Sequence, residues 1–122
     1  MLAPARVETL PVRRLVTIDL IGDLDAELGA SLAQTLDGLT FPADCDVLVN
    51  FKRVVGIDGA GLAAAARAIA QKRLAGWPIS ASVSRRNRSV RNLLASSRIP
   101  FDELPASLPS VRHIMIARHA RD

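Results

Sequence analysis

Strand-like segments alternate with helix-like segments along this chain, and the alternation restricts the fold more than any other feature of the sequence. Strands are predicted at residues 14–20, 46–51 and 77–83, where apolar residues alternate with polar ones or run together. Helices are predicted at residues 25–39, 62–75 and 85–97, where apolar residues recur every three or four positions. This order predicts a largely parallel sheet covered by helices.

Four further segments complete the predicted architecture. Residues 7–10 are interpreted as a short strand, residues 54–57 as the continuation of a strand toward a loop, and residues 99–104 as a short strand around Phe101. Residues 108–119 are predicted to form a terminal helix, because apolar side chains recur there at helical spacing. We therefore expect an α/β fold in a single domain, residues 1–122, with a four- to five-stranded mixed sheet and about four helices.

Composition narrows the function classes. A chain of 122 residues suits one domain, and its 49% hydrophobic content is ample for one core. Aromatic residues make up only 3%, which argues against an aromatic-lined ligand cavity and against a platform that stacks nucleic-acid bases. No apolar run reaches the roughly 20 residues of a membrane span, and Cys45 has no second cysteine to pair with. These features predict a cytoplasmic protein with no membrane span.

The charge is modestly positive. The net charge is +4, and the arginines concentrate after residue 84. This is weaker than the basic stripe of a dedicated nucleic-acid-binding protein, so no direct binding of nucleic acid is expected.

Two loops are candidates for function. Residues 22–25 (Gly-Asp-Leu-Asp) connect a strand to a helix, and residues 57–62 (Ile-Asp-Gly-Ala-Gly-Leu) precede the alanine-rich helix. Loops at the carboxyl ends of parallel strands are where ligands and partners bind. Asp58 also fits a helix N-cap, and Gly59 and Gly61 also fit turn geometry or close packing, so a structural role stays open beside partner contact.

These two loops resemble those of the STAS domain, the fold of the bacterial anti-sigma factor antagonists (anti-anti-sigma factors). Residues 22–25 resemble the Gly-Glu-Leu-Asp turn of that family, and residues 58–62 resemble its Asp-Ser-Ser-Gly-Leu loop. The spacing of the two motifs agrees as well, and the resemblance extends over nearly the whole chain.

The resemblance implies a partner-switching module in transcription regulation. In that family the antagonist binds an anti-sigma factor that is also a serine kinase, and phosphorylation of the second loop serine ends the interaction. The resemblance places the interface at the second loop together with one residue of the first, namely Asp23, Asp58, Gly59, Ala60, Gly61 and Leu62. This chain has Gly59 and Ala60 where the family has its two serines, so the phosphorylation switch does not carry over to this loop.

A cluster of arginines supports an alternative. Arg85, Arg86, Arg88 and Arg91 lie at the start of a predicted helix, where cations oppose the helix dipole. They are either a solvated basic face or, with Arg85, Arg86 and Arg88 as ligands, an anion-binding site of a STAS domain that senses a nucleotide or another anion. A third reading is a cytoplasmic accessory subunit of a membrane transporter. The sequence leaves open whether the protein is a monomer or a homodimer.

Catalytic motifs are absent from the sequence. There is no Gly-x-Ser-x-Gly turn, no phosphate-binding P-loop and no dinucleotide-binding glycine pattern. His113 and His119 have no cysteine or carboxylate at metal-ligand spacing, and we interpret both as surface residues. We therefore expect no enzymatic activity, no catalytic residues, no metal and no cofactor.

Overall fold

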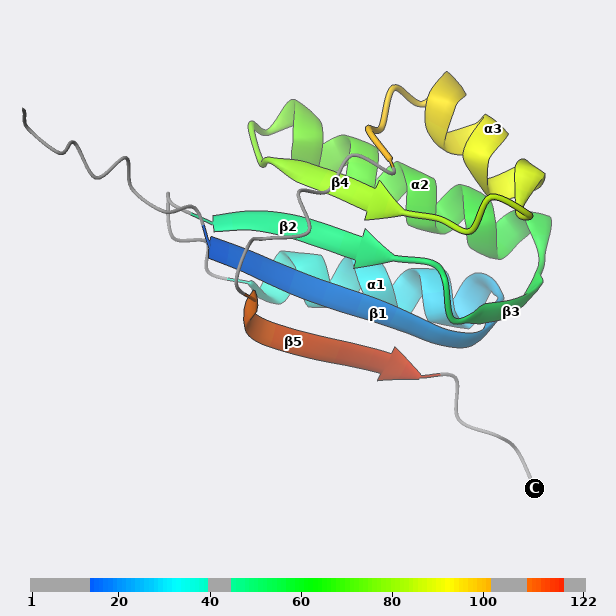
Figure 1. The fold of residues 1–122 in the computed structure, drawn as a ribbon, viewed down its shortest axis with the longest axis horizontal. Helices are drawn as coiled ribbons and strands as arrows, with labels where there is room; N and C mark the ends of the chain where they lie inside the picture. The colour runs from blue at the N-terminus through cyan, green and yellow to red at the C-terminus, as the bar shows by residue number, and fades with distance from the viewer. Residues whose placement is uncertain (1–13, 40–44, 102–109, 118–122) are drawn as a thin grey trace, which may run out of the picture.

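One five-stranded sheet organises the molecule (Figure 1). The computed structural model describes residues 14–39, 45–101 and 110–117. Within these ranges the elements are β1 (Arg14–Leu24), α1 (Ala26–Gly38), β2 (Cys45–Asn50), β3 (Val54–Ile57), α2 (Gly59–Leu74), β4 (Ile79–Ser82), α3 (Arg88–Ser96) and β5 (Ser110–Ala117). None of the three described helices is both long and apolar enough to span a bilayer. The predicted α/β class and strand number are confirmed.

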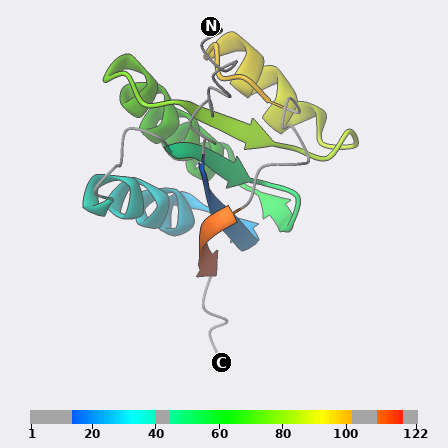
Figure 2. The same cartoon turned by 60° about the vertical axis from the view of Figure 1, so that its left-hand side comes forward.

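All strand pairings in the described ranges are parallel. β1 pairs with β2 and with β5, and β4 pairs with β2. Figure 2 shows β5, β1, β2 and β4 following one another across the sheet. β3 pairs with the last residues of β1, beyond the point where β2 ends. The antiparallel pairing expected of a mixed sheet does not occur among the described strands.

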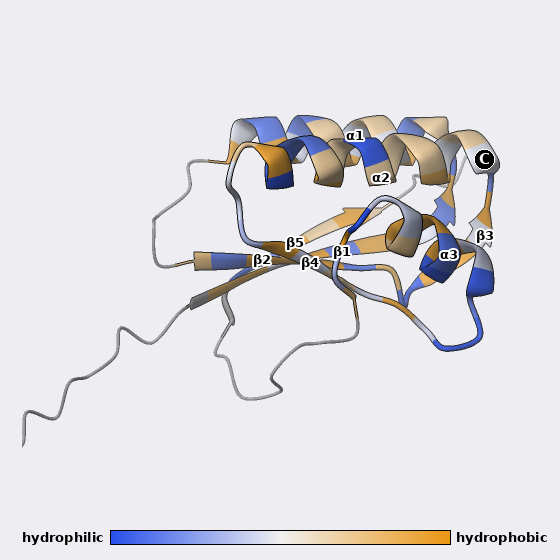
Figure 3. Cartoon of the chain, turned by 90° about the horizontal axis from the view of Figure 1, so that it is seen from above, coloured by the Kyte–Doolittle hydropathy of each residue, from blue (hydrophilic) through white to orange (hydrophobic). Residues whose placement is uncertain are grey.

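The core lies between the sheet and the two longer helices. Figure 3 shows α1 and α2 together on one side of the sheet. Because side chains alternate along a strand, one set of β1 residues faces these helices and the other set faces away. The buried residues of this core include Ile18 and Leu20 of β1, Leu28, Leu32 and Leu36 of α1, and Leu62 and Ile69 of α2. The predicted packing of both helices on the sheet is confirmed.

The two longer helices approach each other closely near their first turns. A Cβ atom added to Gly29 of α1 would lie 2.8 Å from the Cβ atom of Ala64 and 2.9 Å from the carbonyl oxygen of Gly61. A Cβ atom on Gly61 would lie 2.5 Å from the carbonyl oxygen of Leu24. Small residues on both helices therefore allow this contact, which accounts for the alanine-rich sequence of α2.

Each helix begins at a polar cap. The Oδ1 atom of Asp25 accepts a hydrogen bond from the Leu28 amide at 2.9 Å, and that of Asp58 accepts one from the Ala60 amide at 3.0 Å. These are the orphan amides that an N-cap satisfies. The predicted contact between Asp58 and the amide of Ala60 is confirmed. Asn87 caps α3, which is why this helix begins at Arg88 rather than at residue 85.

The prediction of a helix at residues 108–119 is wrong over residues 110–117, which form β5. Ile114 and Ile116 are half-buried and alternate with exposed His113 and Met115, so the strand period fits as well as the helix period. Pairing with β1 decides between the two, since this tertiary contact gives the β-branched side chains a sheet to pack on.

Two smaller predictions have outcomes, and two others fall on residues that the structure does not describe. Residues 54–57 form a strand of their own, β3. Of the strand predicted at residues 99–104, the structure describes residues 99–101, and there Phe101 forms an isolated parallel bridge with Ala81. The strand predicted at residues 7–10 and the residue His119 lie outside the described ranges.

Candidate functional site

The loops predicted from the sequence lie at the carboxyl edge of the sheet. Because the described strands are all parallel, β1, β2, β3 and β4 end at the same edge, and α1, α2 and α3 begin there (Figure 1). The loops that follow these strands are therefore gathered at one end of the molecule. In open parallel sheets this edge is the usual place for a ligand or a partner.

A backbone hydrogen bond joins the two predicted recognition loops. The Asp58 amide donates to the carbonyl oxygen of Leu24 at 2.9 Å. The Gly22 amide donates to the carbonyl oxygen of Arg53, directly before β3, at 3.2 Å. Gly22 has a φ angle of +96°, a conformation that glycine adopts without strain. The structure thus brings the segments 22–25 and 58–62 side by side and fixes their backbones.

The predicted interface residues divide into an exposed and a buried group. Asp23, Asp58, Gly59 and Ala60 are exposed, and we call these four residues the loop surface. Gly61 is buried, and Leu62 is only 6% exposed inside the core. These last two residues therefore hold the loop in place, and a partner would contact the first four.

Two aliphatic side chains that were not among the predicted interface residues extend this surface. Val55 of β3 is 84% exposed. Ile57, which directly precedes Asp58, is 36% exposed. Apolar side chains surrounded by polar ones are typical of surfaces that bind another protein. The available signal was the strand pattern of residues 54–57, which we interpreted only as the approach to a loop.

Replacing Asp58 by alanine is expected to lower the free energy of unfolding by about 1 kcal/mol, because the Ala60 amide loses its cap. Urea unfolding monitored by circular dichroism measures this change. Asp58→Asn is the matched control, since asparagine is also a good N-cap residue and should leave the stability nearly unchanged. Equal stability of Asp58→Ala and the wild type would show that the cap contributes nothing.

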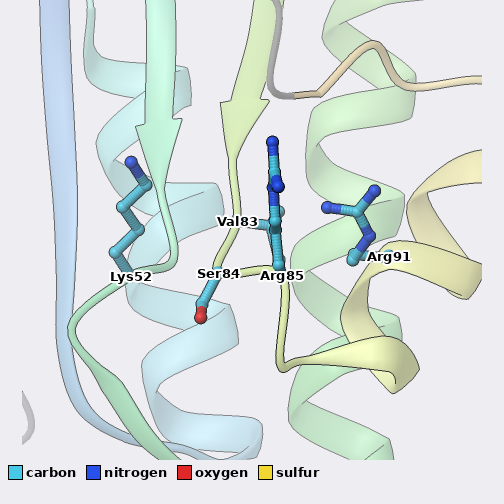
Figure 4. A pocket seen from close by; sticks show the side chains of 5 residues that line it. All are labelled: Lys52, Val83, Ser84, Arg85 and Arg91. Carbon is cyan, nitrogen blue, oxygen red and sulfur yellow. The ribbon is translucent and has the colours of Figure 1, made fainter.

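A second feature of the same edge is a basic cleft, which we define by its lining residues Lys52, Val83, Ser84, Arg85 and Arg91. Its volume is about 730 Å³. Figure 4 shows Lys52 at the end of β2, Ser84 and Arg85 after β4, and Arg91 pointing from α3 toward Arg85. Three separate elements therefore bring cationic side chains to one cleft.

The basic cleft only partly matches the predicted anion-binding residues. Arg85 lines it, whereas Arg86 and Arg88 are exposed and do not line it. Lys52 was missed by the sequence analysis. The available signal was its position directly after the second predicted strand, since neighbouring parallel strands end at one edge.

A third polar cluster lies on the face of the sheet away from α1 and α2. Asp19 of β1 is 4% exposed, and its carboxylate accepts a hydrogen bond from Asn50 Nδ2 at 2.8 Å. His113 Nε2 lies 2.5 Å from the other carboxylate oxygen, and an Arg53 guanidinium nitrogen lies 3.9 Å from it. This cluster links β2 and β5 to β1. His113 is exposed, as predicted, but its contact with Asp19 was not predicted from the sequence.

Within the described ranges, no group of three or more histidine, cysteine or carboxylate side chains is arranged to hold a metal ion. Comparison of the chain with protein-family models, curated proteins and solved structures gave no match. The functional assignment therefore depends on the loops and on the residues that surround them.

Proposed function

We propose that the protein is a partner-binding module of the anti-sigma factor antagonist type, and that its partner is an anti-sigma factor that is also a serine kinase. The observation that carries this proposal is the meeting of the segments 22–25 and 58–62, the two that resemble the STAS motifs, at one exposed edge.

The physical character of the loop surface supports a protein partner. Gly59 and Ala60 present almost no side chain, and no described atom outside the helix backbone and the chain neighbours lies within 4 Å of the position of a Cβ atom on Gly59. A partner can therefore approach the backbone of the first turn of α2 without displacing a long side chain. Exposed Val55 and Ile57 add apolar area beside it, and such area contributes to association when it leaves water.

The loop differs from that of the family in its regulation. A phosphoryl group would add about −1.5 to −2 charges to the interface, but neither Gly59 nor Ala60 has a hydroxyl group to accept it. We therefore propose that this loop binds its partner without being switched off by phosphorylation.

Ala60→Glu is expected to weaken kinase binding by at least about tenfold, because it places a charged side chain in the centre of the loop surface. Folding should be unaffected, since a carboxylate is favourable at a helix N-terminus. Titration calorimetry of the protein with the serine-kinase anti-sigma factors of the same organism measures the binding. Ala95→Glu, an exposed position at the far end of α3, is the control and should bind like the wild type.

The converse variant, Ala60→Ser, restores an acceptor hydroxyl and is small enough to leave binding intact. After incubation with the kinase and ATP, mass spectrometry should find phosphate in this loop of the variant and none in the loop of the wild type. If the wild type binds none of these kinases, or if Ala60→Glu binds as tightly as Ala95→Glu, the proposed function is wrong.

A further inference from the structure

We propose that the basic cleft binds the phosphate groups of a small molecule such as a nucleotide or pyrophosphate. This site is separate from the loop surface and does not depend on the proposed function. The lining of the cleft, its place in the topology and the charge around it each support this inference.

The lining combines the groups that phosphate requires. Lys52, Arg85 and Arg91 provide three cations, the hydroxyl of Ser84 is a fourth polar group, and none of the described lining residues is a carboxylate. Arginine binds phosphate oxygens with two parallel hydrogen bonds, and lysine binds them as a point charge. The Arg91 guanidinium also stacks 5.0 Å from the centre of the Phe101 ring, a contact that restrains the side chain.

The cleft lies beyond the carboxyl ends of two neighbouring strands. β2 and β4 pair in parallel, and Lys52 and Arg85 follow these two strands. In open α/β sheets, crevices outside the carboxyl ends of the strands are the usual ligand sites.

The chain around the cleft is basic. No Asp or Glu occurs between Asp58 and Asp102, and this stretch includes Arg85 and Arg88. Arg88 stands in the first turn of α3, where a cation opposes the helix dipole. A bound anion relieves this repulsion, so phosphate should stabilise the fold as well as occupy the cleft.

Size and lining limit the ligand class. A volume of about 730 Å³ lies within the roughly 300–1,000 Å³ of small-molecule sites. Among the lining residues that the structure describes none is aromatic, so a nucleotide would be held by its phosphates and not by stacking of its base. We therefore expect similar affinities for ATP, GTP and pyrophosphate, and weaker binding of adenosine, which carries no phosphate.

The test is calorimetric titration of the full chain with pyrophosphate, ATP and adenosine at constant ionic strength. We expect pyrophosphate and ATP to bind and to raise the melting temperature, and adenosine to do neither. Lys52→Ala and Arg85→Ala, both at exposed positions, should each weaken pyrophosphate binding by at least about fivefold, and the double variant more. Arg86→Ala removes the same charge from the same loop outside the lining and should bind like the wild type.

Three results would overturn the inference. The first is no binding of pyrophosphate or ATP at millimolar concentration. The second is an equal loss of pyrophosphate affinity in Arg85→Ala and Arg86→Ala, which would show that the anion binds to a diffuse basic surface and not in the cleft. The third is an oligonucleotide that binds more tightly than ATP with equal losses in both variants, which would assign the basic loop to nucleic acid. None of these results would affect kinase binding by the loop surface.

Discussion

Gly61→Ala is expected to lower the free energy of unfolding by about 3 kcal/mol, whereas Gly59→Ala, two residues earlier in α2, should change it by less than about 0.5 kcal/mol. A Cβ atom on Gly61 would meet the backbone of Asp25 and would lie 2.5 Å from the carbonyl oxygen of Leu24. Backbone atoms at a helix start cannot move aside cheaply, so the clash would separate the two loops. A Cβ atom on Gly59 would meet no described atom within 4 Å apart from its chain neighbours and its own helix backbone.

Urea unfolding of the two variants measures this difference in the free energy of unfolding between two positions in the first turn of α2. Gly59→Ala is the matched control, since it introduces the same methyl group and the same change in backbone entropy. Similar stabilities of the two variants would mean that α2 does not pack against the end of β1 as described. The result bears on function too, because this contact fixes the loop surface.

The second large effect concerns the buried carboxylate of β1. Asp19→Ala is expected to lower the free energy of unfolding by about 2–3 kcal/mol, because Asn50 loses its acceptor and His113 loses its carboxylate partner. Arg53, whose side chain is 56% exposed, can turn to water and should contribute little. Thermal or urea unfolding at neutral pH measures the loss.

Asp37→Ala serves as the control for this prediction. Asp37 also pairs with a cation, Lys72 at 2.9 Å, but its side chain is 72% exposed, and such surface pairs contribute less than about 1 kcal/mol. A double-mutant cycle of Asp19→Ala with Asn50→Ala should show coupling, since the two groups share one hydrogen bond. If Asp19→Ala and Asp37→Ala lowered the free energy of unfolding equally, the buried cluster would contribute no more than an exposed ion pair, and the prediction would be wrong.

The parts of the fold that the sequence predicted are those determined by local chemistry. Asp25 and Asp58 each precede a helical pattern, and an N-cap acts only on the amides of the next turn. Leucines four residues apart define the buried face of α1 without reference to any other element. The loops 22–25 and 58–62 were placed at one edge because parallel strands end together.

The parts that the sequence missed depend on which strands become neighbours. Residues 110–117 fit two periods, and only their pairing with β1 makes them a strand. His113 and Asp19 are far apart in the chain and meet through that same register. The contribution of Lys52 to the basic cleft likewise depends on β2 lying beside β4. Such contacts require the strand order, which no local pattern contains.

The most direct measurement of the central claim is a nuclear magnetic resonance titration of the ¹⁵N-labelled protein with an unlabelled serine-kinase anti-sigma factor. If the loop surface is the interface, the amide signals of Asp23, Gly59 and Ala60 shift or broaden first, and those of Arg86 and Arg88 stay in place. Perturbations confined to the arginine loop, or no perturbation at any of the loop-surface amides, would contradict the claim.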